Sequence, residues 1–201
     1  MAGVGETQEP AEFRRAVAAL RDAELRPEVV LEEMSRPRGL APFSAAFAAE
    51  VVDEDDTELG SGRIVLLHNP AGHEAWEGTF RVVTLTRADL EPELATDPLL
   101  PEVGWSWLME SLETRGARHR APSGTVSRST SQGFGGLTAE TQRTEIEVRA
   151  SWTPVDPDEL EAHLHAWADL LCTCAGLPPA AGGPGGPEGV VAMRRPSSRE
   201  V

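Results

Sequence analysis

The stretch Glu145-Ile-Glu-Val-Arg-Ala-Ser-Trp-Thr-Pro154 decides the fold that we expect for this chain. Polar residues alternate in it with apolar ones, which are Ile146, Val148, Ala150 and Trp152. Successive side chains of a strand point to opposite faces of a sheet, so this strand has one apolar face and one polar face. Such alternation is typical of an antiparallel sheet that is covered on one side only. Pro154 cannot donate a ladder hydrogen bond and closes the strand.

Other strands are predicted before this one. Residues 43–52 alternate but are rich in alanine, and we favour a strand over a helix there. Further strands are expected at residues 63–68, 79–87 and 123–132. A polar loop is expected at Asp53–Gly62 and a turn at Asn69–Gly72. In the 79–87 strand the apolar phase shifts between Val82 and Val83, which indicates a bulge or burial on both faces.

Helical spacing of apolar residues predicts four helices. The first begins at Pro10 and carries Phe13, Val17 and Leu20. A short second helix is expected from Pro27 through Met34. The third begins at Pro98 or Pro101 and ends before Gly116. The fourth spans residues 157–175, with Asp156 as N-cap and Glu159 at the capping-box position. Its apolar stripe consists of Leu160, Leu164, Trp167, Leu171 and Cys174.

Together these elements predict an α+β domain. We expect a mainly antiparallel sheet of about five strands, with the 98–115 and 157–175 helices on its apolar face and the N-terminal helices beside it. The domain should span residues 8–178. Residues 1–7 should form a flexible tail, and the Pro/Gly-rich residues 179–201 a disordered one.

Composition limits the function and the compartment. The formal net charge is −15, and a charge of this sign opposes contact with nucleic acid or an anionic membrane. We find no run long enough to span a membrane and no secretory signal. Cys172 and Cys174 lie two apart in a predicted helix, where they point in different directions and cannot bridge each other. We therefore expect an acidic cytoplasmic protein. All 18 basic residues are arginine and tyrosine is absent, which is typical of a GC-rich genome and indicates an actinobacterial source.

Several short stretches resemble a known family. They are His68-Asn-Pro-x-Gly72, Trp76-x-Gly78-x-Phe-Arg81, Asp97-Pro98, Gly104-Trp-Ser-Trp107, Ser123-Gly-Thr-Val126, Glu147-Val-Arg-Ala-Ser-Trp-Thr-Pro154 and Ala175-Gly-Leu-Pro178. Together they are similar to an actinobacterial family catalogued as a domain of unknown function, family 3000. The resemblance covers roughly Glu12 to Pro178 and implies a cytoplasmic single-domain protein. It implies no activity, cofactor or catalytic residue.

A charge contrast suggests an anion site. Between Glu113 and Glu140 there is no acidic residue, yet four arginines lie there: Arg115, Arg118, Arg120 and Arg128. They could bind a phosphorylated ligand or a nucleotide, because a guanidinium group can bind two oxygens at once. The hydroxyls beside them are those of Ser123, Thr125, Ser127 and Ser129. Gly133 and Gly135 would let backbone amides approach a phosphate. The alternative is that these arginines pair with the acidic surplus elsewhere on the surface.

Other candidate sites are weaker. His68 and His73 match no zinc motif, and we expect neither a metal nor a cofactor. No nucleophile elbow is present, so we assign no catalytic residue. Trp105 and Trp107 cannot share one helical face, so at least one could remain exposed and bind a partner.

The sequence alone leaves the function open between two hypotheses. We favour a non-enzymatic cytoplasmic module that binds a protein partner, since no coherent catalytic set is found. The alternative is a domain that binds a phosphorylated ligand or a nucleotide through the arginine window and its glycines. Such a domain could also be an enzyme. RNA binding through the same arginines is disfavoured by the net charge.

Overall fold

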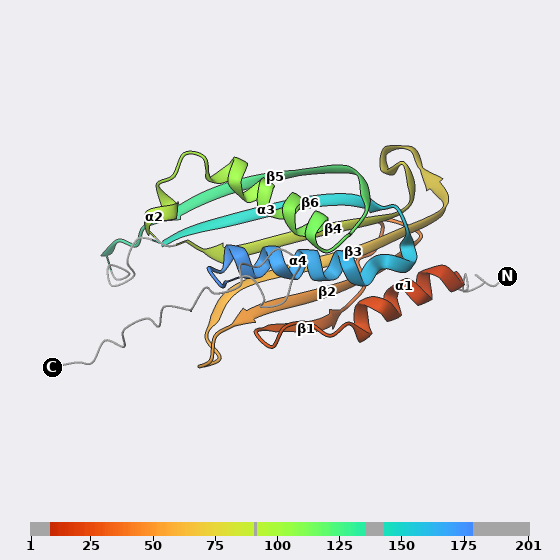
Figure 1. Ribbon diagram of the computed structural model, residues 1–201, viewed down its shortest axis with the longest axis horizontal. Helices are drawn as coiled ribbons and strands as arrows, with labels where there is room; N and C mark the ends of the chain where they lie inside the picture. The colour runs from red at the N-terminus through yellow and green to blue at the C-terminus, as the bar shows by residue number, and fades with distance from the viewer. Residues whose placement is uncertain (1–8, 91, 136–142, 179–201) are drawn as a thin grey trace.

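The computed structural model describes residues 9–90, 92–135 and 143–178, so the two predicted tails lie outside the described residues. Within these ranges one sheet has six strands in the order β1-β2-β3-β4-β6-β5, each antiparallel to its neighbours (Figure 1). The strands are β1 (Val29–Met34), β2 (Phe43–Val52), β3 (Glu58–His73), β4 (Gly78–Asp89), β5 (His119–Ser131) and β6 (Arg143–Pro154). The α+β prediction is confirmed, with one strand more than we expected.

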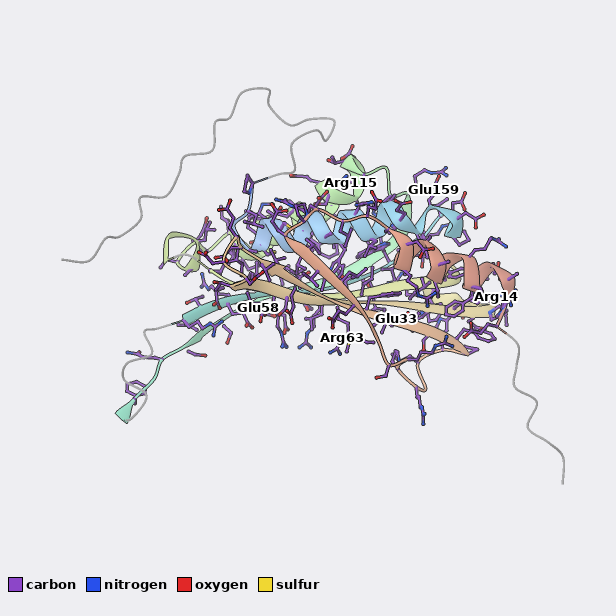
Figure 2. All side chains as sticks on the ribbon, turned by 90° about the horizontal axis from the view of Figure 1, so that it is seen from below. Arg14, Glu33, Glu58, Arg63, Arg115 and Glu159 are labelled. Atoms are coloured by element: carbon purple, nitrogen blue, oxygen red, sulfur yellow. The ribbon has the colours of Figure 1, made fainter. Side chains whose placement is uncertain are left out.

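Three helices cover one face of this sheet: α1 (Ala11–Asp22), α3 (Leu100–Thr114) and α4 (Leu160–Cys174) (Figures 1 and 2). A short helix, α2 (Pro92–Ala95), precedes α3, and 3-10 turns lie at η1 (Glu74–Trp76) and η3 (Pro157–Glu159). Helices α1, α3 and α4 correspond to three of the four predicted helices. Among the described helices, none is long and apolar enough to cross a membrane.

Strand β6 has the predicted two-sided character. Ile146, Val148, Ala150 and Trp152 are buried beneath the helices, and the strand ends at Pro154. The predicted stripe of α4 is buried as well. Asp156 caps the first turn, because its carboxylate accepts the amide hydrogen of Asp158 at 2.9 Å. The Glu159 carboxylate instead binds Arg118.

Helix α4 approaches the sheet closely where β3 carries a glycine. A Cβ atom on Gly62 would lie 2.5 Å from the carbonyl oxygen of Leu85 and 2.7 Å from the ring of Trp167, so no other residue fits there without a shift. The Trp167 ring lies over this position, fully buried, and its Nε1 donates to Thr86 Oγ1 at 3.1 Å. The indole thus fills the space between helix and sheet while its polar atom is satisfied.

Two local predictions are wrong. The short second helix is strand β1, which pairs with β2 from Val29↔Val51 to Met34↔Ala46. A helix of so few residues is marginal by itself, and pairing with β2 satisfies the backbone instead. The predicted loop Asp53–Gly62 is shorter, because β3 begins at Glu58. The Asp53 carboxylate closes it by accepting from the amides of Asp55 and Thr57, each at 2.9 Å.

The predicted turn at Asn69–Gly72 is an irregularity within β3. Its expected chemistry is present, since Asn69 Oδ1 accepts the amide hydrogen of Ala71 at 3.1 Å. The chain reverses a few residues later, through η1 and Glu77, whose φ of 56° is left-handed. The pairing of β3 with β4 shifts across this segment.

The phase shift in β4 reflects burial on both faces. Phe80, Arg81 and Val82 are consecutive and all buried, and the β3–β4 register is continuous from His68↔Phe80 to Gly60↔Ala88. Of our two interpretations, the bulge is therefore wrong and two-sided burial is confirmed. One consequence is that Arg81 is buried on the face that carries no described helix.

Replacing Trp167 by alanine should reduce the free energy of unfolding by about 3–5 kcal/mol, because it leaves a cavity under α4 and removes the partner of Thr86. Urea denaturation of Trp167→Ala measures this loss. The half-buried Trp76 in η1 is a control, and Trp76→Ala should lose clearly less. Equal losses for the two variants would contradict the central place of Trp167.

Acid should destabilise the fold through His163. Trp152 Nε1 donates to His163 Nδ1 at 3.0 Å, and burial lowers the pKa of His163 to about 4, with a smaller effect of His119 in the same direction. In the unfolded chain a histidine has a pKa of about 6.5, so between these pH values only the unfolded state binds the proton. Stability should therefore fall as the pH drops below about 6.5, by up to roughly 3 kcal/mol at pH 4 from this residue.

The variant His163→Gln isolates this contribution, because a glutamine oxygen can still accept from Trp152 but does not titrate. Unfolding free energies of both proteins, measured from pH 7 to 4.5, should converge as the pH falls. Parallel curves would exclude His163 as the cause.

Candidate functional site

The sheet has one face that no described helix covers, and we call it the open face. Figure 2 shows the helices on one side of the sheet and Arg63 pointing away from them on the other. The strand register places every second residue of β3, β4, β5 and β6 on this face, including the pairs Val65↔Val83 and Ser123↔Ser151. The open face is the polar side that the alternation in β6 predicted.

An apolar row crosses the middle of the open face. Val65 on β3 and Val83 and Leu85 on β4 are half-buried, although no described helix packs on them. Next to them, Ala46 and Leu67 are buried by their neighbours on the sheet. The row therefore leaves apolar surface accessible to a ligand or a partner.

A shallow hollow of about 500 Å³ lies over this row. Its lining comes from β3, β4, β5 and β6: Arg63, Val65, Val83, Thr84, Leu85, Ser123, Gly124, Thr125, Arg149, Ala150 and Ser151. The floor is apolar, and hydroxyl and guanidinium groups surround it. We call this feature the hollow.

Arg81 is a buried cation beside the hollow. Only 6% of it is exposed, and its Nη2 donates to Ser151 Oγ at 2.8 Å and to Ser123 Oγ at 3.1 Å. Its Nη1 donates to the carbonyl oxygen of Ala121 at 2.9 Å and to Thr153 Oγ1 at 3.2 Å. All four acceptors are neutral. Among the described residues, no carboxylate forms an ion pair with this guanidinium.

An irregularity in β5 completes the surroundings of Arg81. The β5–β6 register shifts between Arg120 and Ser123, and Ala121 within it has a left-handed φ of 48°. This conformation is uncommon for an alanine. It coincides with the hydrogen bond from Arg81 to the carbonyl oxygen of Ala121.

Positive charge exceeds negative charge around the hollow. Glu147 accepts from Arg87 at 2.7 Å and forms an ion pair with Arg149 at 2.7 Å. Burial acts to raise the pKa of Glu147, but the hydrogen bonds from these two arginines outweigh it and lower the pKa below its usual value. Arg63 is exposed on the same face. Burial lowers the pKa of Arg81, and the charge of Glu77 opposes this shift. A guanidinium remains charged at neutral pH even so.

Comparison with known proteins identifies the family of this chain. Residues 9–183 match the family model described as "Protein of unknown function (DUF3000)". The chain belongs to the DUF3000 family. No curated protein and no solved structure matches it.

Three of the seven stretches that carry the DUF3000 resemblance meet at or beside the hollow. Arg81 ends one of them, Ser123 and Thr125 lie in a second, and Arg149 and Ser151 lie in a third. The sequence analysis named Ser123 and Thr125 as hydroxyls beside the arginine window, but it named neither Arg81 nor Arg149 nor Ser151. The only signal was the phase shift at Val82–Val83, which indicated that β4 is buried on both faces beside Arg81.

The structure does not bring the predicted arginine site of this DUF3000 chain together. Arg115 forms two hydrogen bonds to Asp169 of α4, at 2.6 and 2.8 Å, and Arg118 binds Glu159. Arg120 donates to the carbonyl oxygen of Glu77 at 3.5 Å, on the open face, whereas Arg128 pairs with Ile146 in the register and so faces the helices. These contacts agree with the alternative that the arginines pair elsewhere on the surface.

The predicted glycines lie at the other end of β5. Gly133 and Gly135 follow Ser131, so the length of the strand, roughly 35 Å at about 3.3 Å per residue, separates them from Arg120. Phosphorylated-ligand binding by the whole set stays a prediction, and no described contact favours it.

Trp105 and Trp107 are both half-buried and pack against the core. A Cβ atom on Gly124 would lie 2.7 Å from the ring of Trp105, so this indole lies closely on β5 from the helix side. Partner binding by these two residues stays a prediction. The packing of Trp105 on Gly124 attaches α3 to β5.

The histidines and cysteines of the core have structural contacts. His68 is buried between Phe13 and Phe80, its Nδ1 faces the carbonyl oxygen of Thr79 at 3.1 Å, and burial lowers its pKa. Burial raises the pKa of Cys172 to about 11 and of Cys174 to about 12, which disfavours thiolates. In the part of the chain that the structure describes, no three His, Cys, Asp or Glu side chains are placed to hold a metal ion.

Arg81→Met should destabilise the fold by at least about 2 kcal/mol, because it leaves the carbonyl oxygen of Ala121 and the hydroxyl of Thr153 without their donor. Arg63→Met is the matched control, and an exposed arginine should change stability by no more than about 0.5 kcal/mol. Urea denaturation compares the two. A loss for Arg81→Met as small as that of the control would mean that Arg81 does not organise this part of the sheet.

Proposed function

We propose that this DUF3000 protein is a non-enzymatic cytoplasmic binding module that receives an acidic, apolar-sided segment of a partner protein on its open face. The observation that carries the proposal is the half-buried row of Val65, Val83 and Leu85 beside arginines that outnumber the carboxylates around them. A partner segment can cover the apolar surface of this row, and the arginines favour a segment that is negatively charged.

The apolar row supports a docking surface. Contiguous apolar area on a protein surface marks interaction sites more often than scattered apolar residues do. Here the residues are consecutive partners across two strands, Val65↔Val83 and Arg63↔Leu85, and the hollow lies directly over them. Covering them by a partner would remove apolar surface from water, which favours binding.

The charges support an acidic partner over a second copy of this chain. Arg63, Arg81, Arg87 and Arg149 lie on this part of the face. Fewer carboxylates oppose them: Glu147 pairs with Arg87 and Arg149, and the charge of Glu77 acts on Arg81. A second copy docked face to face would bring the same arginines against each other, and like charges disfavour such a contact. An acidic segment would instead be attracted, despite the net charge of −15 for the whole chain.

The chemistry of the hollow supports binding over catalysis. The hydroxyls on its open side belong to Ser123, Thr125 and Ser151, and its described lining contains no histidine or carboxylate that could act as a general base. A serine needs such a neighbour to become a nucleophile. The buried thiols of Cys172 and Cys174 hold their protons and are poor nucleophiles.

Selection of displayed random peptides on the immobilised full chain tests the proposal. Enriched peptides should combine apolar residues with Asp or Glu, and synthetic versions should bind the wild type in fluorescence anisotropy. Leu85→Asp should weaken them by at least about tenfold, because it puts a charge that repels their carboxylates on the apolar row.

Leu99→Asp is the control, since Leu99 is an exposed leucine that lies at the start of α3 and not on the open face. It should bind the peptides as the wild type does. Failure to enrich any peptide, or equal binding to both variants, would refute docking on the open face.

A further inference from the structure

The two serines that touch Arg81 are also part of the wall of the hollow. Ser123 and Ser151 face each other across β5 and β6, with their Oγ atoms 3.2 Å apart. Each Oγ accepts a hydrogen from Nη2 of the buried Arg81. Both hydroxyls therefore lie between the guanidinium and the space of the hollow.

The hydroxyl hydrogens of these serines have few places to point. Neither can point at Arg81, because a guanidinium has donors only. One hydrogen can lie between the two Oγ atoms, since either serine can be the donor of that contact. The hydroxyl hydrogen of the other serine can then be donated only to an acceptor outside the pair. Because both side chains line the hollow, that acceptor can lie in the hollow. Arg81 polarises this hydroxyl, which strengthens it as a donor.

Among the described residues, no carboxylate forms an ion pair with Arg81, although the charge of Glu77 acts on it. Taking a cation out of water is costly unless an anion pairs with it, and here the four acceptors are neutral. On the rim of the hollow, Arg149 shares Glu147 with Arg87, and Arg63 adds a further cation. An anion placed over Ser123 and Ser151 would therefore meet a hydroxyl donor and positive charge together.

We propose that the hollow is a binding site for a carboxylate attached to an apolar chain. The carboxylate accepts from the hydroxyls of Ser123 and Ser151, and the apolar chain lies on Val65, Val83 and Leu85. A phosphate group fits less well, because it brings up to two charges and three acceptor oxygens to a site whose central donors are two hydroxyls. The volume of about 500 Å³ is typical of a small-ligand site.

This inference rests on the proposed function in one respect: the apolar row must be accessible for binding. The same chemistry has two possible sources, which are an Asp or Glu side chain of a partner protein and the head group of a free alkyl carboxylate. The experiment therefore has one arm for each source.

The first arm uses octanoate and its neutral analogue octanamide as probes in calorimetric titrations of the full chain at low salt. The second uses the selected peptides and versions in which Gln and Asn replace Glu and Asp. Both arms compare the wild type with the double variant Ser123→Ala/Ser151→Ala. The control is Ser129→Ala/Ser131→Ala, which removes two exposed hydroxyls from the same strand and face outside the lining.

The expected result is that a carboxylate probe binds at least about tenfold more tightly than its amide, and that this preference is lost in Ser123→Ala/Ser151→Ala but kept in the control. A preference seen with octanoate indicates a free alkyl carboxylate, and one seen only with peptides indicates a partner's side chain. Thermal melting of each variant checks that it is folded, and Ser151→Ala alone replaces the double variant if the latter melts early.

The two proposals fail in different ways. If peptides bind the open face but their amide versions bind equally well, and octanoate binds no better than octanamide, the carboxylate site is refuted while protein docking stands. If octanoate binds through the two serines but no peptide is enriched, docking of a partner is refuted while the carboxylate site stands. A preference for carboxylate that survives in the double variant also refutes the site proposed at Ser123 and Ser151.

Discussion

The contact between α4 and the middle of the sheet determines how the rest of the chain is arranged. Trp167 lies where Gly62 leaves room for its ring, and Trp152 reaches back from β6 to His163 on the helix. Both indoles are fully buried and both donate a hydrogen bond across the interface. Because this packing is dense and both indole nitrogens are hydrogen-bonded, α4 has one position on the sheet, and α1 and α3 pack beside it on the same face.

Placing these three helices on one side gives the two faces of the sheet different chemistry. The helix side takes up the large apolar residues, and both of its buried indoles find a partner, as in the contact of Trp167 with Thr86. The open side retains smaller apolar residues, serines and arginines. Arg81 is the exception, because it is buried on the open side by the irregular start of β5 and bonds only neutral acceptors there. The guanidinium of Arg81 thus has no ion-pair partner among the described residues, and together with the apolar row this makes the open face a candidate binding surface.

Local patterns predicted most of the fold but little of the candidate site. The alternation in β6 and β2 and the stripe of α4 are confirmed, since burial of one face imposes a period that is visible in the sequence. Strand β1 was missed because six residues carry too little periodicity to separate a strand from a helix, and its pairing with β2 settles the choice. The arginine window looked like one site because its members are close in sequence. Arg115 and Arg118, however, pair with acidic residues before the strand begins, and the extended β5 carries Arg120 and Arg128 apart.

The sequence by itself determined the α+β class, the helix that covers the sheet and the existence of a polar, uncovered face. These follow from side-chain periodicity, which depends on neighbours a few residues away. Only the tertiary structure decided which residues meet on that face. Arg81, Ser123 and Ser151 come from three strands, and their contact depends on the strand order and on a register shift in β5. Neither leaves a local pattern in the chain, because both arise from pairing between segments that are distant in sequence.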